Sequence, residues 1–193
     1  MRGRRATGTV SKVINGIDVG SVSVVGLGYV GLTLASCLAS KGFRVIGIDV
    51  DRGRVEAVNS GRSPLQEPGL ERLMRSSLRR GTLKATSDHE ELSKTDLTFI
   101  TVGTPSLPDG SIDLRYVVEA SRSIGRALRS KEGRHLVVVK STVVPGTTER
   151  VVAPIVAEAS GRDLGDSLLV AVNPEFLSEG SAVRDMMKPD RIV

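Results

Sequence analysis

Short apolar runs rich in β-branched residues alternate with longer amphipathic stretches from Val22 onward, and this alternation limits the possible folds more than any other feature. Such runs are typical of strands that are buried on both faces of a parallel sheet. The strand candidates are VSVVG (22–26), RVIGID (44–49), LTFITVG (97–103), HLVVVKS (135–141), LLVAVN (168–173) and, more weakly, TLKAT (82–86).

Helical patterns fill the intervals between these runs. Apolar residues recur at helical spacing in residues 31–42, 113–129 and 147–161. Asp113 is the expected N-cap of the second helix, and Pro154 should kink the third helix or displace its start. The repeated strand–helix–strand order predicts an α/β fold with a mostly parallel, doubly wound sheet, in which ligands bind along the edge formed by the carboxyl ends of the strands.

Composition and charge argue against several classes of function. Aromatic residues make up 3% of the 193 residues and tryptophan is absent, so a stacking platform for single-stranded nucleic acid is not expected. The net charge of +5 arises from basic residues scattered among acidic ones, which indicates a solvated surface and no nucleic-acid partner. No apolar run approaches the roughly 20 residues that span a bilayer, so no membrane partner is expected.

The first twenty residues differ from the rest in charge. MRGRRATGTVSK contains four basic residues and no acidic one, and it lacks the apolar core of a signal peptide. We expect residues 1–20 to form a disordered basic extension and residues 21–193 to form one domain. Cys37 is the only cysteine, which fits a reducing, cytoplasmic setting without a disulfide framework or a thiolate metal site.

Glycines after the first strand have the spacing of a dinucleotide-binding turn. Gly26, Gly28 and Gly31 follow the pattern G-x-G-x-x-G at the mouth of a predicted helix. The first glycine permits a tight turn, the second lets the backbone approach a pyrophosphate, and the third permits close packing of helix on strand. The helix N-terminus then offers N–H groups and partial positive charge to the phosphates.

Asp49 ends the second predicted strand, where a carboxylate can accept the hydroxyl groups of the adenosine ribose. Its charge would repel a 2′-phosphate, which favours NAD over NADP, although Arg52 and Arg54 follow closely and weaken that inference. Arg54 either lies beside the adenosine or is a solvated helix residue. Residues 21–193 are therefore expected to form a Rossmann-like NAD-binding domain.

Residues 173–180, NPEFLSEG, place two carboxylates directly after the last predicted strand. If a helix begins within residues 176–180, Glu175 and Glu179 lie four residues apart on one face and can share a site. The alternative for Glu179 is an acid in the first turn of a helix, stabilised by the helix dipole. A nearby carboxylate suits hydride removal from an alcohol, because the hydroxyl proton must leave as well.

Five segments, in this order, resemble the UDP-glucose/GDP-mannose dehydrogenase family: GLGYVGL (26–32), DVDRGRV (49–55), VGTP (102–105), KSTVVPGTTE (140–149) and NPEFLSEG (173–180). The likeness runs from about Val22 to the last residue and implies the family's N-terminal NAD-binding domain. It implies a cofactor site made of Gly26, Gly28, Tyr29, Val30, Gly31, Asp49, Arg54, Gly103, Thr104, Pro105, Ser141 and Thr142. Two of these have structural alternatives, since Thr142 can satisfy backbone groups and Thr104 can stiffen the turn at Pro105.

The resemblance also implies an activity. Members of this family use two NAD⁺ to oxidise the primary alcohol of a nucleotide-linked sugar to a carboxylate, through an aldehyde held on the enzyme. It implies that Thr142 helps to hold a water near the reacting carbon, that Glu175 is a general base acting through this water, and that Glu179 shares the role. Contacts with the sugar nucleotide are implied for Glu175, Phe176, Leu177, Ser178 and Glu179. UDP-glucose is the favoured substrate, and GDP-mannose or a UDP-N-acetylhexosamine is the alternative.

The chain departs from the family pattern at two positions. Ser178 stands where members often carry a basic residue or alanine, and Gly53 interrupts the start of the helix after Asp49. The first departure bears on the contact with the sugar nucleotide, and the second bears on the contact made by Arg54.

The second oxidation in the family needs a cysteine nucleophile, a lysine and an asparagine that lie beyond the NAD-binding domain. Cys37 is not expected to replace that cysteine, because it lies mid-helix on the face that packs on the sheet. We therefore expect the cofactor-binding half of an enzyme, ending before the family's central helix and C-terminal domain, inactive alone, and dimeric only with the missing part. The alternative is a non-catalytic nucleotide-binding module. Residues 189–193, PDRIV, resemble the start of another strand.

Overall fold

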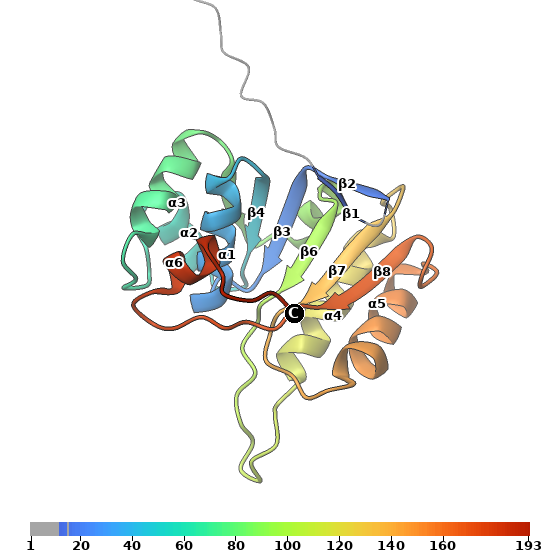
Figure 1. The fold of residues 1–193 in the computed structure, drawn as a ribbon. Helices are drawn as coiled ribbons and strands as arrows, with labels where there is room; N and C mark the ends of the chain where they lie inside the picture. Colours follow the sequence, from blue (N-terminus) through green and yellow to red (C-terminus); the bar gives the residue numbers. More distant parts are fainter. Residues whose placement is uncertain (1–11, 15) are drawn as a thin grey trace, which may run out of the picture.

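The parallel sheet that the alternation predicts is present in the computed structural model, which describes residues 12–14 and 16–193 (Figure 1). Its strands are β3 (Ser21–Val25), β4 (Arg44–Ile48), β5 (Leu83–Thr86), β6 (Leu97–Ile100), β7 (His135–Val139) and β8 (Leu168–Val172). They lie in the order β5-β4-β3-β6-β7-β8, and every neighbouring pair is parallel. The expected α/β, Rossmann-like, doubly wound fold is confirmed, including the weaker strand candidate at residues 82–86.

Both faces of the sheet are buried, because successive side chains of each strand enter different apolar cores. Along β7, Leu136 and Val138 join one core, whereas Val137 and Val139 join the other. The first face is covered by α1 (Tyr29–Ser40) and α3 (Leu70–Arg79), and the second by α4 (Arg115–Leu128) and α5 (Ala153–Ser160). Burial on both sides explains why the strands appear in the sequence as continuous apolar runs.

Shorter helical elements connect these layers: α2 (Arg52–Asn59), a 3-10 helix (His89–Lys94), a π-helical turn (Thr148–Val152) and α6 (Ala182–Met187). Pro154 lies in the first turn of α5 and displaces the start of that helix to Ala153, as expected. The expected N-cap of α4 is wrong by one residue, because Leu114 occupies that position. The Asp113 carboxylate instead accepts hydrogen bonds from the backbone N–H and the guanidinium of Arg115.

Two expectations for the chain after β8 are wrong. No helix begins within residues 176–180, since the left-handed backbone of Gly180 (φ 83°) favours a turn and α6 starts only at Ala182. Residues 189–193 form no strand. They lie against the loop that follows β8 instead, where the carbonyl of Val193 accepts a hydrogen bond from the Asn173 side chain.

A small hairpin precedes the sheet. β1 (Lys12–Ile14) pairs with β2 (Ile17–Val19) in antiparallel fashion, and Ile17 and Val19 are buried in the core under α1 and α3. Most of the basic extension expected over residues 1–20 lies outside the described residues, so the division of the chain at residue 21 stays a proposal. Among the helices in the described part, none has the length and apolar character that crossing a membrane requires.

A buried polar chain links three strands through the core of the sheet. The imidazole Nε2 of His135 lies 2.8 Å from the Thr98 hydroxyl, which in turn lies 2.7 Å from the Ser23 hydroxyl. All three residues are fully buried. Burial lowers the pKa of His135 to about 3, so its imidazole is neutral at physiological pH.

The order of the strands reverses between β3 and β6, so the crossover connections run in opposite directions from this junction. β4 and β5 extend the sheet on one side of β3, whereas β6, β7 and β8 extend it on the other. At the amino end of this junction, one oxygen of the Asp96 carboxylate accepts hydrogen bonds from the N–H groups of Gly20 and Ser21 and from the Ser21 hydroxyl, at 2.6 to 3.0 Å. Open α/β sheets bind ligands at the carboxyl end of such a junction.

Candidate functional site

Close contacts at the turn after β3 require the first and third glycines of the motif. Gly26 has a φ of 95°, and a Cβ atom on it would lie 2.9 Å from the carbonyl oxygen of Thr101. A Cβ atom on Gly31 would lie 1.8 Å from the carbonyl oxygen of Gly26. The Thr101 hydroxyl contacts the carbonyl oxygens of Val25 (2.9 Å) and Gly26 (2.7 Å), so the end of β6 supports the turn. Sequence reasoning missed this role of Thr101.

Gly28 differs from the other two glycines of the motif, Gly26 and Gly31, because it faces open space. No heavy atom lies within 4 Å of a Cβ atom built on it, and its backbone angles (φ −69°, ψ −164°) suit any residue. It is the N-cap of α1, where no side chain caps the helix, so the first N–H groups of α1 are free of a side-chain acceptor. The opening and the helix N-terminus together fit a pyrophosphate.

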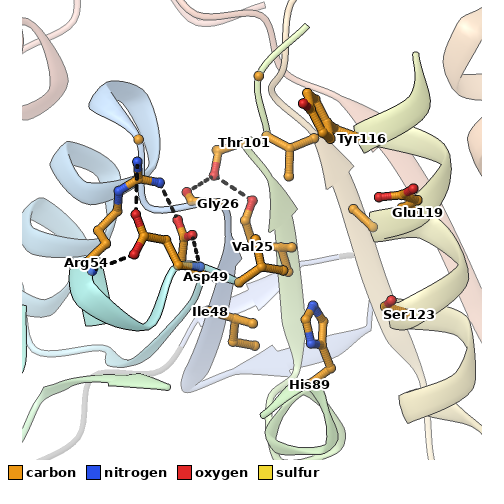
Figure 2. A pocket seen from close by; sticks show the side chains of 16 residues that line it. Val25, Gly26, Ile48, Asp49, Arg54, His89, Thr101, Tyr116, Glu119 and Ser123 are labelled. Atoms are coloured by element: carbon orange, nitrogen blue, oxygen red, sulfur yellow. Dashed lines mark hydrogen bonds and ion pairs between the residues drawn. The ribbon is translucent and has the colours of Figure 1, made fainter. Parts of the chain in front are cut away.

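Asp49 follows β4, with 6% of the residue exposed, and its carboxylate already has several hydrogen-bond donors (Figure 2). Its Oδ2 accepts from the N–H of Leu27 (2.6 Å) and from the guanidinium of Arg54 (2.9 Å). Its Oδ1 accepts from the N–H of Asp51 (2.9 Å). Asp49 therefore orients the glycine turn, and Arg54 of α2 lies across the carboxylate that was expected to meet the ribose.

An open cleft of about 650 Å³ extends from the glycine turn to α4 (Figure 2). The wall opposite Asp49 includes Tyr116, Glu119 and Ser123 of α4, and His89 also lines the cleft. Sequence reasoning missed this wall. The only available signal was that three polar side chains recur at helical spacing on one face of α4.

The structure brings only some of the predicted cofactor residues to this cleft. Its lining includes Gly26, Gly28, Asp49, Arg54 and Gly103. The remaining predicted residues lie along the same edge or in α1, outside the lining: Tyr29, Val30, Gly31, Thr104, Pro105, Ser141 and Thr142.

Ser141 joins the loops that follow β6 and β7. Its hydroxyl donates to the carbonyl of Val102 (2.6 Å), and its N–H donates to the carbonyl of Ile100 (3.0 Å). The next residue, Thr142, is exposed at this edge, and Thr104 is half-buried. The VGTP and KST segments therefore lie next to each other beside the cleft, as the order of the strands requires.

Lys140 holds the start of the segment that contains the two predicted acids. Its ammonium group donates to the side-chain oxygen of Asn173 (3.0 Å) and to the carbonyl of Pro174 (3.3 Å). Burial lowers the pKa of Lys140, and the nearby Glu175 carboxylate opposes this shift. Sequence reasoning assigned no role to Lys140, although it begins the KST segment.

The two acids do not share a helix face, because residues 176–180 form no helix. Glu175 is half-buried and accepts a hydrogen bond from the N–H of Leu177 (2.8 Å), whereas Glu179 is exposed. A second open cleft, of about 500 Å³, is lined in part by the predicted substrate residues Phe176, Leu177 and Ser178. Arg184 and Arg191 line this cleft together with Asp185 and Asp190, so its charge is mixed.

Cys37 is confirmed as a core residue. It is 2% exposed in the middle of α1, and burial raises the pKa of its thiol to about 11. A nucleophilic cysteine needs the opposite shift. Within the described residues, no group of three or more histidine, cysteine, aspartate or glutamate side chains is arranged to hold a metal ion.

Comparisons with known proteins agree with this geometry. Residues 20–193 match the profile of the UDP-glucose/GDP-mannose dehydrogenase family, NAD binding domain. The chain is 48% identical over 172 residues to the UDP-glucose 6-dehydrogenase AglM of Haloferax volcanii, and 45% identical over 173 residues to a GDP-mannose 6-dehydrogenase of Pseudomonas syringae. Each alignment covers 89% of this chain and 40% of the relative.

Solved structures give the same result. A UDP-glucose dehydrogenase from Pyrobaculum islandicum superposes with a TM-score of 0.85 and 52% identity, covering 94% of this chain and 41% of that one. A ternary complex of the GDP-mannose dehydrogenase from Pseudomonas aeruginosa superposes with a TM-score of 0.85 and 44% identity, covering 87% of this chain and 39% of that one. The chain thus spans about 40% of the length of the relatives that it matches.

Proposed function

The chain belongs to the UDP-glucose/GDP-mannose dehydrogenase family as its NAD-binding domain, and we propose accordingly that it is the cofactor-binding part of a nucleotide-sugar 6-dehydrogenase that acts on UDP-glucose. The observation that carries the proposal is the cleft at the β3–β6 junction, where Gly28 and Asp49 line the same opening. The first leaves room for backbone to approach a phosphate, and the second offers a carboxylate to a ribose.

The residues of this cleft fit NAD. The space beside Gly28 and the N-terminus of α1 suit the pyrophosphate, and the Asp49 carboxylate suits the adenosine ribose. The nicotinamide supplies a hydride acceptor when NAD is bound. We propose that the guanidinium of Arg54 then gives up part of its ion pair with Asp49 and contacts the adenosine end of NAD. The charge of Asp49 disfavours a 2′-phosphate.

Proton removal from the sugar alcohol is assigned to Glu175. It is half-buried near the ammonium group of Lys140, at the edge of the sheet where a carboxylate can take a proton through a water. The hydroxyl of the exposed Thr142, three residues after β7, is proposed to hold that water. Glu179 remains a second candidate for the role.

Substrate binding is assigned to the second cleft. Phe176, Leu177 and Ser178 line it, and the guanidinium groups of Arg184 and Arg191, which lie beside Asp185 and Asp190, offer donors to the phosphates of a nucleotide sugar. UDP-glucose is preferred because relatives named for it are among the most similar at both levels of comparison. Relatives named for GDP-mannose are nearly as similar, so that substrate is the alternative within the same chemistry.

The proposal is tested in two steps, because the chain spans about 40% of the relatives' length. Titration calorimetry of the 193-residue chain should detect NAD binding, with no NADH formed from UDP-glucose, since one domain alone does not hold the sugar against the nicotinamide. If the reading frame extends beyond residue 193, the extended protein should produce NADH from UDP-glucose. Turnover with GDP-mannose alone would overturn the choice of substrate.

A non-catalytic nucleotide-binding module is the candidate from another class. It would bind NAD equally well but would show no turnover in any extended form and no effect of Glu175→Gln. In an active protein, Glu175→Gln should lower kcat more than it weakens NAD binding. Unchanged turnover would transfer the role to Glu179 or to a residue outside this chain.

A further inference from the structure

A buried carboxylate outside the two clefts connects the cofactor turn to the substrate segment. Glu67 lies in the loop between α2 and α3, within SPLQEPGL (63–70). It is 8% exposed. A charged group at this depth is costly unless hydrogen bonds satisfy it.

Three donors from two distant parts of the chain converge on Glu67. The Tyr29 hydroxyl donates to one carboxylate oxygen, Oε2, and the N–H of Gly180 donates to the same oxygen at 2.8 Å. The N–H of Val183 donates to the other oxygen at 3.5 Å. Burial opposes ionisation of Glu67, but these hydrogen bonds outweigh it and lower its pKa, so the group is an anion at neutral pH.

The donors to Glu67 come from the two parts of the chain to which the cofactor and the substrate are assigned. Tyr29 is the first residue of α1 and directly follows Gly28, so its N–H group belongs to the helix N-terminus proposed for the pyrophosphate, although Tyr29 does not line the cleft. Gly180 ends the segment that contains Glu175 and Glu179, and α6 begins two residues later. The phenol and the amide meet on one carboxylate oxygen although 151 positions separate their residues in the sequence.

We propose that Glu67 is a positioning residue that transmits occupancy of the glycine turn to the segment of residues 173–180. A phosphate held at the N-terminus of α1 restricts the backbone of Tyr29. Because the Tyr29 hydroxyl donates to Glu67, this also restricts the orientation of the Glu67 carboxylate. That carboxylate in turn orders the amides of Gly180 and Val183. The inference rests on the proposed cofactor site, and it predicts that bound NAD orders the segment of residues 173–180.

Hydrogen exchange of the 193-residue chain, with and without NAD, tests the inference directly. In the wild type, NAD should slow amide exchange at Gly180 and Val183 several-fold. Tyr29→Phe should keep the slow basal exchange at Gly180, because Glu67 still accepts its N–H, but should abolish the further slowing by NAD. Glu67→Gln should raise basal exchange at Gly180 by roughly tenfold, the factor expected when a charge-assisted hydrogen bond becomes a neutral one.

Glu71→Gln is the matched control. It removes the same charge four residues away, on an exposed side chain that pairs with Arg75, and should change neither the basal exchange nor the response to NAD. Tyrosinate absorbance after a rapid pH jump supplies a second readout, because the chain has two tyrosines and no tryptophan. Burial and then the Glu67 hydrogen bond raise the pKa of Tyr29 to about 12, and Glu67→Gln should lower it in part. Tyr116→Phe identifies which tyrosine titrates.

The outcomes separate this inference from the proposed function. If NAD does not bind the wild type, the cofactor site and the inference both fail. If NAD binds and leaves exchange at Gly180 unchanged, or slows it equally in Tyr29→Phe, only the inference fails. An unchanged pKa of Tyr29 in Glu67→Gln would overturn the contact itself.

Discussion

Alanine at Gly28 and alanine at Gly31 should separate cofactor binding from folding. Both substitutions add one methyl group within the same motif, three residues apart. At Gly28 the methyl group meets no atom within 4 Å, whereas at Gly31 it would lie 1.8 Å from the carbonyl oxygen of Gly26 and 2.6 Å from the Thr101 hydroxyl. The first variant should fold normally and bind NAD poorly, and the second should fold poorly.

The structure sets the magnitudes. Gly28→Ala gains from a less flexible unfolded chain but loses a good N-cap, so its free energy of unfolding should stay within about 1 kcal/mol of the wild type. Gly31→Ala must move backbone, because 1.8 Å is far below the 3.0 Å that real Cβ contacts respect, and it should cost at least about 3 kcal/mol. For a chain of this size that corresponds to a Tm lower by roughly 6–12 °C.

Calorimetric titration and thermal unfolding measure the two effects on the same samples. NAD affinity should fall at least about tenfold in Gly28→Ala, because a methyl group keeps the pyrophosphate from the charge-assisted N–H contacts of α1. The reasoning is refuted if Gly28→Ala binds NAD as the wild type does. It is refuted equally if Gly31→Ala unfolds at the wild-type temperature.

Three further perturbations test separate parts of the structure. Asp49→Asn should weaken NAD binding and also lower the free energy of unfolding by about 1–3 kcal/mol, because the N–H groups of Leu27 and Asp51 lose a charged acceptor; calorimetry and denaturant titration would detect both losses. Cys37 should resist thiol reagents at pH 8 in the native chain and react after unfolding, since its pKa is raised to about 11, and rapid native labelling would contradict its burial. His135 has a folded pKa of about 3, below its ordinary value of 6.5, so the stability that it contributes is present above pH 6.5 and is lost as the pH falls toward 3. Denaturant titrations should show a loss of about 2 kcal/mol between pH 6.5 and 5, and a flat profile there would show that the imidazole is not buried in its neutral form.

The parts of the fold that depend on local pattern could be predicted from the sequence. The strands were recognisable because burial on both faces makes each of them a continuous apolar run, and the glycine turn because its glycines have fixed spacing. Asp49 could be placed because it ends the strand that follows the turn. The burial of Cys37 could also be predicted, because the sequence pattern places it on the apolar side of α1.

The rest depends on contacts between distant residues, which no local pattern reveals. Thr101 supports Gly26 from another strand, and Lys140 holds Asn173 across the carboxyl edge. The helix expected within residues 176–180 is absent, because Gly180 adopts a left-handed backbone and donates its N–H to the remote carboxylate of Glu67. The spacing of Glu175 and Glu179, four residues apart, could not reveal this contact with Glu67.

The Asp96 contact has a consequence for the order in which the chain folds. β3 pairs with β4 after a connection of about twenty residues, whereas the contact between Ser21 and Asp96 closes a loop of 75 residues. Loop closure on that scale costs about 1 kcal/mol more in chain entropy, which makes the β3–β6 junction the slower closure of the two. The pairing of β3 with β6 is therefore expected to form after the pairing of β3 with β4. A dinucleotide bound across the β3–β6 junction would lengthen the lifetime of that pairing by slowing the first step of unfolding.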